Sequence, residues 1–161
     1  MKKRQGKVAL LVMALFALLA CDELTWIIAD MPPATPSEIP PFVITKPRME
    51  VNERPFYFNY AGMVFNFLNQ AEKTVEAIVV SFVLFDPETM ESPFFTSNKF
   101  QITRWDTVFP GENKEIIISL DQFISVAPSN PYLVDLFYIY EIQYVDGSVW
   151  SDDHGKHRVR N

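Results

Sequence analysis

The sequence TVEAIVVSFVLFD, residues 74–86, carries apolar side chains at most of its positions. Its even positions from Ile78 to Leu84 are apolar, and so are most of its odd positions from Val75 to Phe85. Such a run is typical of a central strand in a sheet covered on both faces, or of a strand whose outer face meets a partner. β-Branched residues dominate the run and turn-forming residues flank it, so a strand is favoured over a helix.

Two strand-like runs precede this stretch, and we expect the folded domain to begin near residues 42–54. The run RPFYFNY, residues 54–60, ends at a turn signal, Ala61-Gly62, and MVFNFL, residues 63–68, ends at the polar turn 69–73. Aromatic residues fill the interiors of sandwiches, whereas an exposed apolar patch would mark a partner-binding surface. We therefore expect most of the alternating aromatic residues to lie in the core: Phe56, Tyr57, Phe58, Tyr60, Phe65 and Phe67.

Three further strands are predicted after residue 86. Residues 99–105 alternate between apolar and polar types, residues 114–120 read KEIIISL, and a long run extends from Pro131 to Val145. Along this last run, strict alternation would place Leu136, Tyr138, Tyr140, Ile142 and Tyr144 on one face, and Phe137, Ile139, Glu141, Gln143 and Val145 on the other. Asp146-Gly147 then predicts a hairpin to residues 148–151. About seven strands without a convincing helix indicate an all-β fold, a single antiparallel β-sandwich.

Four short motifs lie between residues 62 and 120: Phe65-Asn66-Phe67-Leu68-Asn69, Lys73-Thr74-Val75, Phe82-Val83-Leu84-Phe85-Asp86 and Pro110-Gly111-Glu112. Together these motifs resemble the immunoglobulin-like sandwich domains of the FxLYD type found in bacterial envelope proteins. The resemblance covers residues 62–120, with the hairpin at residues 142–148 similar to the closing hairpin of related sandwiches. It implies an immunoglobulin-like sandwich over residues 42–153 and names no ligand or catalytic group.

The N-terminus has the pattern of an export signal. Residues 1–20 begin with basic residues, continue with an uncharged run from Val8 to Ala20, and end just before the single cysteine, Cys21. Leu18-Leu19-Ala20-Cys21 resembles the lipobox of bacterial lipoproteins. The resemblance implies a signal-peptide helix at residues 1–20, cleavage after Ala20, and acylation of Cys21 by membrane lipid. An uncleaved N-terminal anchor is the alternative, which the acidic pair after Cys21 opposes.

The rest of the N-terminal region and the charge agree with a lipid-anchored protein outside the cytoplasm. Residues 31–47 hold six of the 12 prolines, so residues 21–41 are predicted to be a lipidated cysteine followed by an extended spacer, at ~3.1 Å per residue. Loss of residues 1–20 changes the formal charge from −6 to −10, which disfavours nucleic-acid binding. The sequence predicts a bacterial cell-envelope location without distinguishing the inner from the outer membrane.

Few residues point to chemistry. His154 and His157, with Asp152 and Asp153 nearby, are weak candidates for a metal site, and a solvated C-terminal tail at residues 154–161 is the simpler expectation. Catalysis by paired carboxylates such as Asp86 and Glu88 is a minor alternative, and the sequence has no glycine-rich phosphate loop. No cofactor and no enzymatic activity are therefore predicted.

The sequence thus predicts a lipoprotein whose domain binds another envelope protein or supports an assembly. A domain that binds a small ligand or a metal, through its end loops or its histidine-containing tail, is the alternative.

Overall fold

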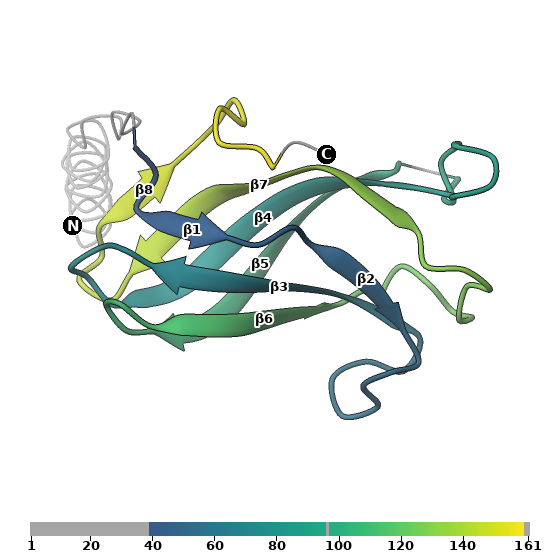
Figure 1. Ribbon diagram of the computed structural model, residues 1–161, viewed down its shortest axis with the longest axis horizontal. Coiled ribbons are helices and arrows are strands. Elements are labelled where there is room, and N and C mark those ends of the chain that lie inside the picture. The colour runs from purple at the N-terminus through teal and green to yellow at the C-terminus, as the bar shows by residue number, and fades with distance from the viewer. Residues whose placement is uncertain (1–38, 96, 160–161) are drawn as a thin grey trace, which may run out of the picture. The chain divides into compact units, whose positions relative to one another are not determined.

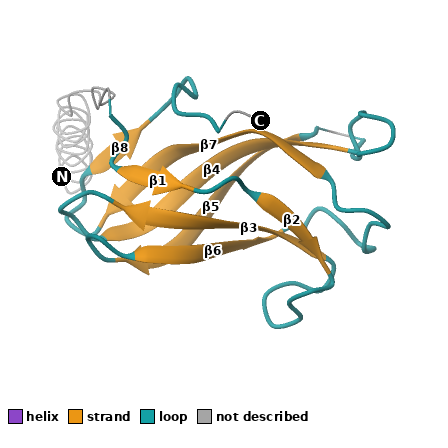
Figure 2. Ribbon diagram, viewed as in Figure 1, coloured by secondary structure: helices purple, strands orange, loops and turns teal. Residues whose placement is uncertain are grey.

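The computed structural model describes residues 39–95 and 97–159, which belong to one compact unit, Pro36–Asn161. The predicted signal peptide, Cys21 and most of the predicted spacer lie outside the described residues. The described part of the chain contains strands, turns and loops without an α-helix (Figure 2). Its strands are β1 (Phe42–Ile44), β2 (Arg48–Val51), β3 (Ala61–Asn69), β4 (Val75–Phe85), β5 (Lys99–Val108), β6 (Asn113–Ser119), β7 (Leu133–Tyr144) and β8 (Val149–Ser151).

The strands form two antiparallel sheets that pack as a β-sandwich (Figure 1). In the first sheet β3 is central, with β6 along one edge and the short strands β1 and β2 along the two halves of its other edge. The strand order of the second sheet is β5-β4-β7-β8. The prediction that residues 74–86 contain a central strand is therefore confirmed, and so is the all-β class.

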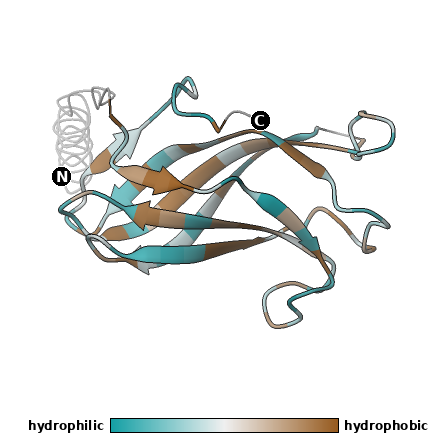
Figure 3. Ribbon diagram, viewed as in Figure 1, coloured by the Kyte–Doolittle hydropathy of each residue, from teal (hydrophilic) through white to brown (hydrophobic). Residues whose placement is uncertain are grey.

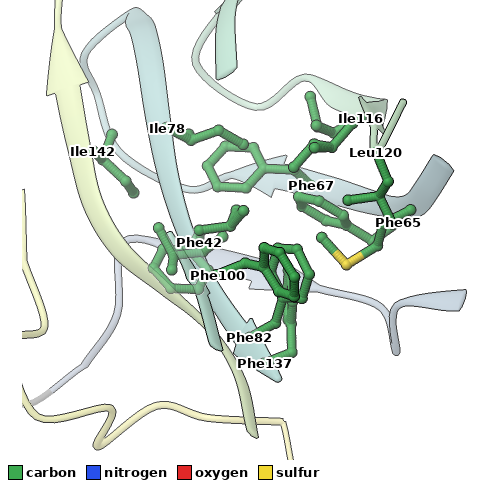
Figure 4. Close-up of a cluster of buried hydrophobic side chains, with 14 of the residues drawn as sticks. Phe42, Phe65, Phe67, Ile78, Phe82, Phe100, Ile116, Leu120, Phe137 and Ile142 are labelled. Atoms are coloured by element: carbon green, nitrogen blue, oxygen red, sulfur yellow. The ribbon is translucent and has the colours of Figure 1, made fainter. Parts of the chain in front are cut away.

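Alternate residues of both sheets point into one core. Apolar residues alternate with polar ones along the strands of both sheets (Figure 3), and ten of the buried side chains are labelled in Figure 4. Phe65 of β3 and Phe137 of β7 meet edge to face with ring centroids 4.9 Å apart, which joins the two sheets. Burial of each such side chain stabilises the fold by roughly 1.5–3 kcal/mol. The largest fully buried side chains are Phe65, Phe67, Phe82, Phe137, Met63, Ile78, Leu84, Ile116, Leu120, Ile139, Ile142 and Val64.

The first strand also ties the sandwich together. Phe42 of β1 stacks on Phe67 of the same sheet at 5.7 Å and meets Trp150 of β8, in the other sheet, edge to face at 5.2 Å. The first strand of the domain is therefore fixed to both sheets.

The strict alternation predicted along β7 is wrong, because two β-bulges interrupt it. The register with β4 shifts between the pairs Val79–Glu141 and Val80–Ile139, so that Tyr140 is an extra residue. A second shift lies at Leu136, whose φ of 49° is in the left-handed region. Each bulge moves the following side chains to the opposite face. The inward residues are consequently Phe137, Ile139, Ile142 and Tyr144.

The expectation of a strand at residues 54–60 is also wrong, as is that of core positions for Phe56 and Tyr57. The segment is a loop, in which the N–H groups of Tyr57 and Phe58 donate to the carbonyl oxygen of Arg54 at 2.9 and 3.2 Å. Pro55 lacks the N–H that a paired strand would use, which favours the turn. Phe58 is buried, whereas Phe56 is 98% exposed and Tyr57 58%.

The two ends of the sandwich differ in the segments that they carry (Figures 1 and 2). At the end that we call proximal, the chain arrives from residue 39 into β1, beside the loops 70–74, 109–112 and 145–148. The opposite end, which we call distal, carries the three loops 52–60, 86–98 and 120–132, here named the distal loops. At the proximal end Gly147, with φ 81°, closes the hairpin predicted at Asp146-Gly147.

Candidate binding surface at the distal loops

The distal loops expose apolar side chains on otherwise ordered turns. Phe95 is fully exposed, Phe56 is 98% exposed and Val126 is 75% exposed. Tyr57, Met90 and Phe123 are also exposed, so each of the three loops contributes two such residues. Exposed apolar side chains in groups mark surfaces used in protein recognition, whereas single ones are ordinary.

An aromatic cluster holds two of these loops against the sandwich. Phe100 at the start of β5 stacks on the core residue Phe82, with centroids 5.3 Å apart. Around Phe100 are Phe94 of the loop 86–98, at 5.1 Å, and Phe123 of the loop 120–132, at 4.8 Å. Phe94 also meets Tyr132 edge to face at 5.8 Å. The exposed residues of these loops therefore project from a packed base.

The third distal loop, 52–60, is held by charged groups. Arg54 donates through Nε to Glu50 on β2, at 2.7 Å, and through Nη1 to Glu115 on β6. These bonds raise the pKa of Arg54 above its already high value and lower that of Glu115. Bidentate Arg–carboxylate geometry is among the stronger ionic arrangements. The bridge fixes the first half of the loop against the outer face of the first sheet.

Asp121 connects the loop 120–132 to the end of the loop 52–60. Its carboxylate accepts the N–H groups of Asn59 at 2.6 Å and of Tyr60 at 2.9 Å. Burial raises the pKa of Asp121, but the bonds from Asn59, Tyr60 and Ala61 outweigh burial, so its pKa lies below the ordinary value. The charged carboxylate thus acts as a clamp between two distal loops.

The carboxylates considered for acid–base chemistry have structural partners. Asp86 accepts the N–H groups of Glu88 at 2.9 Å and Thr89 at 3.0 Å, and these bonds, that from Thr89 foremost, lower its pKa. Glu88 accepts a bond from the side-chain amide of Asn130, at 2.9 Å, which joins the loops 86–98 and 120–132. Asp86 closes an Asx-type turn and Glu88 joins two loops.

A pocket of about 320 Å³ opens beside the distal loops, between β2 and the first half of β7. Small-molecule sites usually measure about 300–1,000 Å³, so this pocket is at the lower limit. Its lining is mixed and includes the charged residues Lys46, Arg48 and Asp135. The apolar part of the lining includes Pro47, Met49, Phe85, Met90, Leu133 and Val134.

The structure places the two histidines in different surroundings within the C-terminal segment 152–159. This segment returns along β7: the N–H of Asp152 donates to Tyr140 and that of Val159 to Phe137, both at 2.8 Å. The His157 ring lies 6.0 Å from that of Trp150, and its Nε2 atom is buried without a partner among the described residues. His154 is exposed.

The carboxylate of Asp152 is buried in the same segment and accepts the N–H groups of Lys156 at 2.9 Å and His157 at 2.8 Å. In residues 39–95 and 97–159, no three His, Cys, Asp or Glu side chains are grouped as metal ligands would be. Cys21, the predicted lipidation site, lies outside the described residues. The described residues also contain no helix long and apolar enough to cross a membrane.

Sequence analysis missed most of the exposed apolar residues at the distal end. Phe95, Met90, Phe123 and Val126 all lie in segments rich in turn-forming residues. An apolar residue within such a segment is the one signal that could have identified them, since turns are usually at the surface.

Comparison with known proteins supports the fold alone. Neither protein-family models nor curated proteins match this chain. A solved structure, a hypothetical protein from Peptoclostridium difficile 630, is similar with a TM-score of 0.52 at 11% sequence identity. The match covers 75% of this chain and 91% of the other chain. The sandwich architecture is therefore shared with a protein of very different sequence.

Proposed function

We propose that this protein is a bacterial envelope lipoprotein, anchored through acylated Cys21, whose non-catalytic domain binds another envelope protein through its distal loops. The observation that carries the proposal is the position of exposed apolar side chains relative to the start of the domain. Phe56, Phe95 and Val126 lie on the distal loops, whereas the chain that comes from Cys21 joins the sandwich at the proximal end. A tether at one end leaves the opposite end accessible to a partner.

The distal loops are held rigidly, as expected for a binding surface rather than for apolar side chains that are exposed without a function. Aromatic stacking on Phe100, the Arg54 bridge and the Asp121 clamp fix the loops before any partner arrives. A preorganised surface loses less conformational entropy on association than a mobile one. Aromatic residues are also enriched among the side chains that contribute most to protein–protein affinity.

We also infer that the sandwich is of the immunoglobulin-like kind. The arrangement of β1/β2, β3 and β6 in one sheet and β4, β7 and β8 in the other corresponds to strands A, B, E and C, F, G of that fold. The remaining strand, β5, pairs with β4, whereas in constant-type domains the fourth strand joins the sheet of A, B and E.

The absence of catalysis is part of the proposal. The most plausible catalytic side chains have other tasks: Asp86 closes a turn, Glu88 joins two loops, and Asp152 binds two backbone N–H groups. The formal charge of −10 after signal cleavage, with 20 acidic residues, also favours partners other than nucleic acid.

Site-specific photocross-linking in the native bacterium tests the binding surface. A photoreactive phenylalanine analogue is introduced at Phe56 or at Phe95, and at Phe109 as the matched control. Phe109 is 61% exposed but lies at the proximal end. We expect a discrete adduct with a membrane or envelope protein from the two distal positions and none from position 109. Adducts of equal yield from all three positions, or none from any, would contradict the proposal.

The anchor is tested separately by metabolic labelling with a fatty-acid analogue. We expect the wild-type chain to carry the label. A Cys21→Ala variant should carry no label, and its signal peptide should not be cleaved. A wild-type chain that carries no label and keeps residues 1–20 would instead favour the uncleaved anchor.

A small ligand in the pocket between β2 and β7 is the second candidate function, favoured by the volume of about 320 Å³ and by the apolar part of its lining. Because Met90 belongs both to this lining and to the exposed distal residues, a ligand there could also modulate partner binding. Val134→Trp should fill the pocket. A compound screen would identify ligands that raise the melting temperature of the wild-type protein. If such a ligand no longer stabilises the Val134→Trp variant, while photocross-linking from position 95 is retained, the ligand binds in the pocket.

A further inference from the structure

A second, smaller pocket lies on the outer face of the second sheet, where the C-terminal segment crosses β7. Its volume is about 150 Å³. A water molecule accounts for about 30 Å³ of the liquid, so the pocket holds a group the size of a few waters. The polar side chains in its lining are Ser81 of β4, Lys99 of β5, Tyr138 of β7, and His154 and Arg158 of the C-terminal segment.

The lining combines two cations with a histidine and contains no carboxylate. Five of the nine described lysines and arginines form ion pairs with carboxylates, namely Arg48, Arg54, Lys73, Arg104 and Lys114. Lys99 and Arg158 have no such partner among residues 39–95 and 97–159. In a protein with more acidic than basic residues, two unpaired cations at one pocket form a local positive potential.

The nearby carboxylates of the C-terminal segment are engaged elsewhere. Asp152 is buried and accepts the N–H groups of Lys156 and His157. Asp153 bonds with the Tyr140 hydroxyl and, mainly through its negative charge, raises the pKa of that tyrosine. Neither aspartate belongs to the lining, so the charge of the pocket is not compensated by the segment that forms it.

The backbone of the C-terminal segment fixes the shape of the pocket. Gly155 has φ 63° and lies against the Tyr138 ring, where an added Cβ would come within 3.2 Å of Cε1. The Nε–H of Arg158 donates to the carbonyl oxygen of Gly155 at 3.1 Å. This bond orients the guanidinium group and leaves its Nη donors without a partner among the described residues.

From this arrangement we propose that the pocket binds a phosphate group. Lys99, His154 and Arg158 come from two separate segments and together line the pocket. Three such donors suit an oxyanion with several accepting oxygens, such as phosphate, better than a carboxylate with two. The same charges oppose a metal ion, so His154 serves here as an anion ligand. None of the lining residues belongs to a distal loop, and the site does not depend on the partner proposed for those loops.

Titration of the purified full chain with inorganic phosphate, followed by NMR, tests the proposal. We expect saturable shifts of the Gly155 and Val83 amide signals, because both residues line the pocket. Lys99→Gln and Arg158→Gln should each weaken binding about threefold, the effect of losing one exposed ionic contact. Lys46→Gln, which removes an equally charged side chain from the other pocket, should leave the affinity unchanged.

Two further ligands define the chemistry and its source. Acetate should bind more weakly than phosphate, and equal binding of acetate would overturn the assignment to phosphate. Competition by glycerol 3-phosphate would indicate a phosphate carried on a larger molecule such as a lipid headgroup, and its failure to compete would indicate free phosphate. No saturable shift with phosphate, or equal losses in Lys46→Gln and Lys99→Gln, would refute the site. Lys99 is exposed at the start of β5, so the Lys99→Gln result stands even if Arg158→Gln unfolds the segment.

Discussion

The ring of Phe58 lies directly on Gly62, so that a Cβ built on Gly62 would be 2.4 Å from Phe58 Cδ1. Phe58 belongs to a loop, yet with Val64 and Ile117 it forms a small apolar cluster on the outer face of the first sheet. This contact is therefore a second attachment of the loop 52–60, in addition to the Arg54 bridge. Gly62 allows it because it has no side chain.

The first prediction concerns this contact. Gly62→Ala should lower the free energy of unfolding by about 1–3 kcal/mol, because the added methyl group displaces the Phe58 ring. Urea denaturation measures the change. Combined with Phe58→Ala, the same substitution should cost much less, since the obstacle is gone. If Gly62→Ala lowered the free energy of unfolding equally with and without Phe58→Ala, contact with the Phe58 ring would not be the reason that residue 62 must be glycine.

The second prediction concerns the Arg54 bridge. Arg54→Met should measurably destabilise the domain, because it leaves the buried Glu50 with Arg48 as its remaining ionic partner among the described residues. The variant should also increase hydrogen exchange at the amides of Tyr57 and Phe58. Lys46→Met is the matched control, since Lys46 forms no ion pair among the described residues, and it should change neither quantity. Unchanged stability of Arg54→Met would show that Arg48 can replace Arg54.

The third prediction is a pH dependence. The pKa values of Asp86, Glu115, Asp121, Asp146 and Asp152 all lie below their ordinary values. The unfolded chain therefore binds these protons at higher pH than the native protein does. Stability should be nearly constant from pH 7 to about 5 and should fall as the pH decreases further through the ordinary carboxyl range of about 4.

Arg54→Met provides the control for this pH dependence. The variant lacks the group whose hydrogen bond contributes most to lowering the pKa of Glu115. Its stability should therefore decrease less steeply than that of the wild type between pH 5 and 3, as urea midpoints at several pH values would reveal. Parallel curves for the two proteins would assign the acid sensitivity to the other carboxylates.

The fourth prediction concerns the C-terminal segment. Asp152→Ala removes the acceptor for the N–H groups of Lys156 and His157, and loss of such a buried acceptor costs about 1–3 kcal/mol. The segment should open, with faster hydrogen exchange at residues 155–159 than in the wild type. Asp153→Ala, at the exposed neighbouring position, should leave exchange at Lys156 and His157 unchanged. Equal protection in Asp152→Ala would mean that pairing with β7 alone holds the segment.

The fifth prediction separates binding from stability at the distal loops. Phe56→Ser and Phe95→Ser should each change the free energy of unfolding by less than about 0.5 kcal/mol, because both side chains are exposed. Both should reduce the yield of the photocross-link formed from the other position. Phe94→Ser, in contrast, should destabilise the domain, since Phe94 packs on Phe100 and Tyr132. Full cross-linking in Phe56→Ser and Phe95→Ser would place the partner elsewhere.

The two-faced apolar run at residues 74–86 was sufficient to predict a central strand, because such runs are typical of strands that have a paired strand on each side. Within that strand, however, Ala77, Val79 and Ser81 are also buried, and each is paired with residues of both β5 and β7. Which side chains lie beside them depends on the order of the strands in the sheet, and the sequence pattern of a single strand does not reveal that order.

The candidate surfaces were less accessible to sequence reasoning. Phe56 and Phe58 are two residues apart and chemically identical, yet one is exposed and the other covers Gly62. His154, a weak metal candidate in the sequence, lines a pocket together with Lys99, which lies 55 residues earlier in the chain. Such neighbours are set by tertiary contacts between distant segments.

The sequence by itself determined the all-β class, the central strand and the hairpin at Asp146-Gly147, because local periodicity and turn chemistry act over a few residues. Only the tertiary structure decided which faces of β7 turn inward, since the bulges at Leu136 and Tyr140 arise where its register adjusts to β4. The tertiary structure also decided which loops share the distal end, because the direction and pairing of the strands bring the strand ends that flank these loops together.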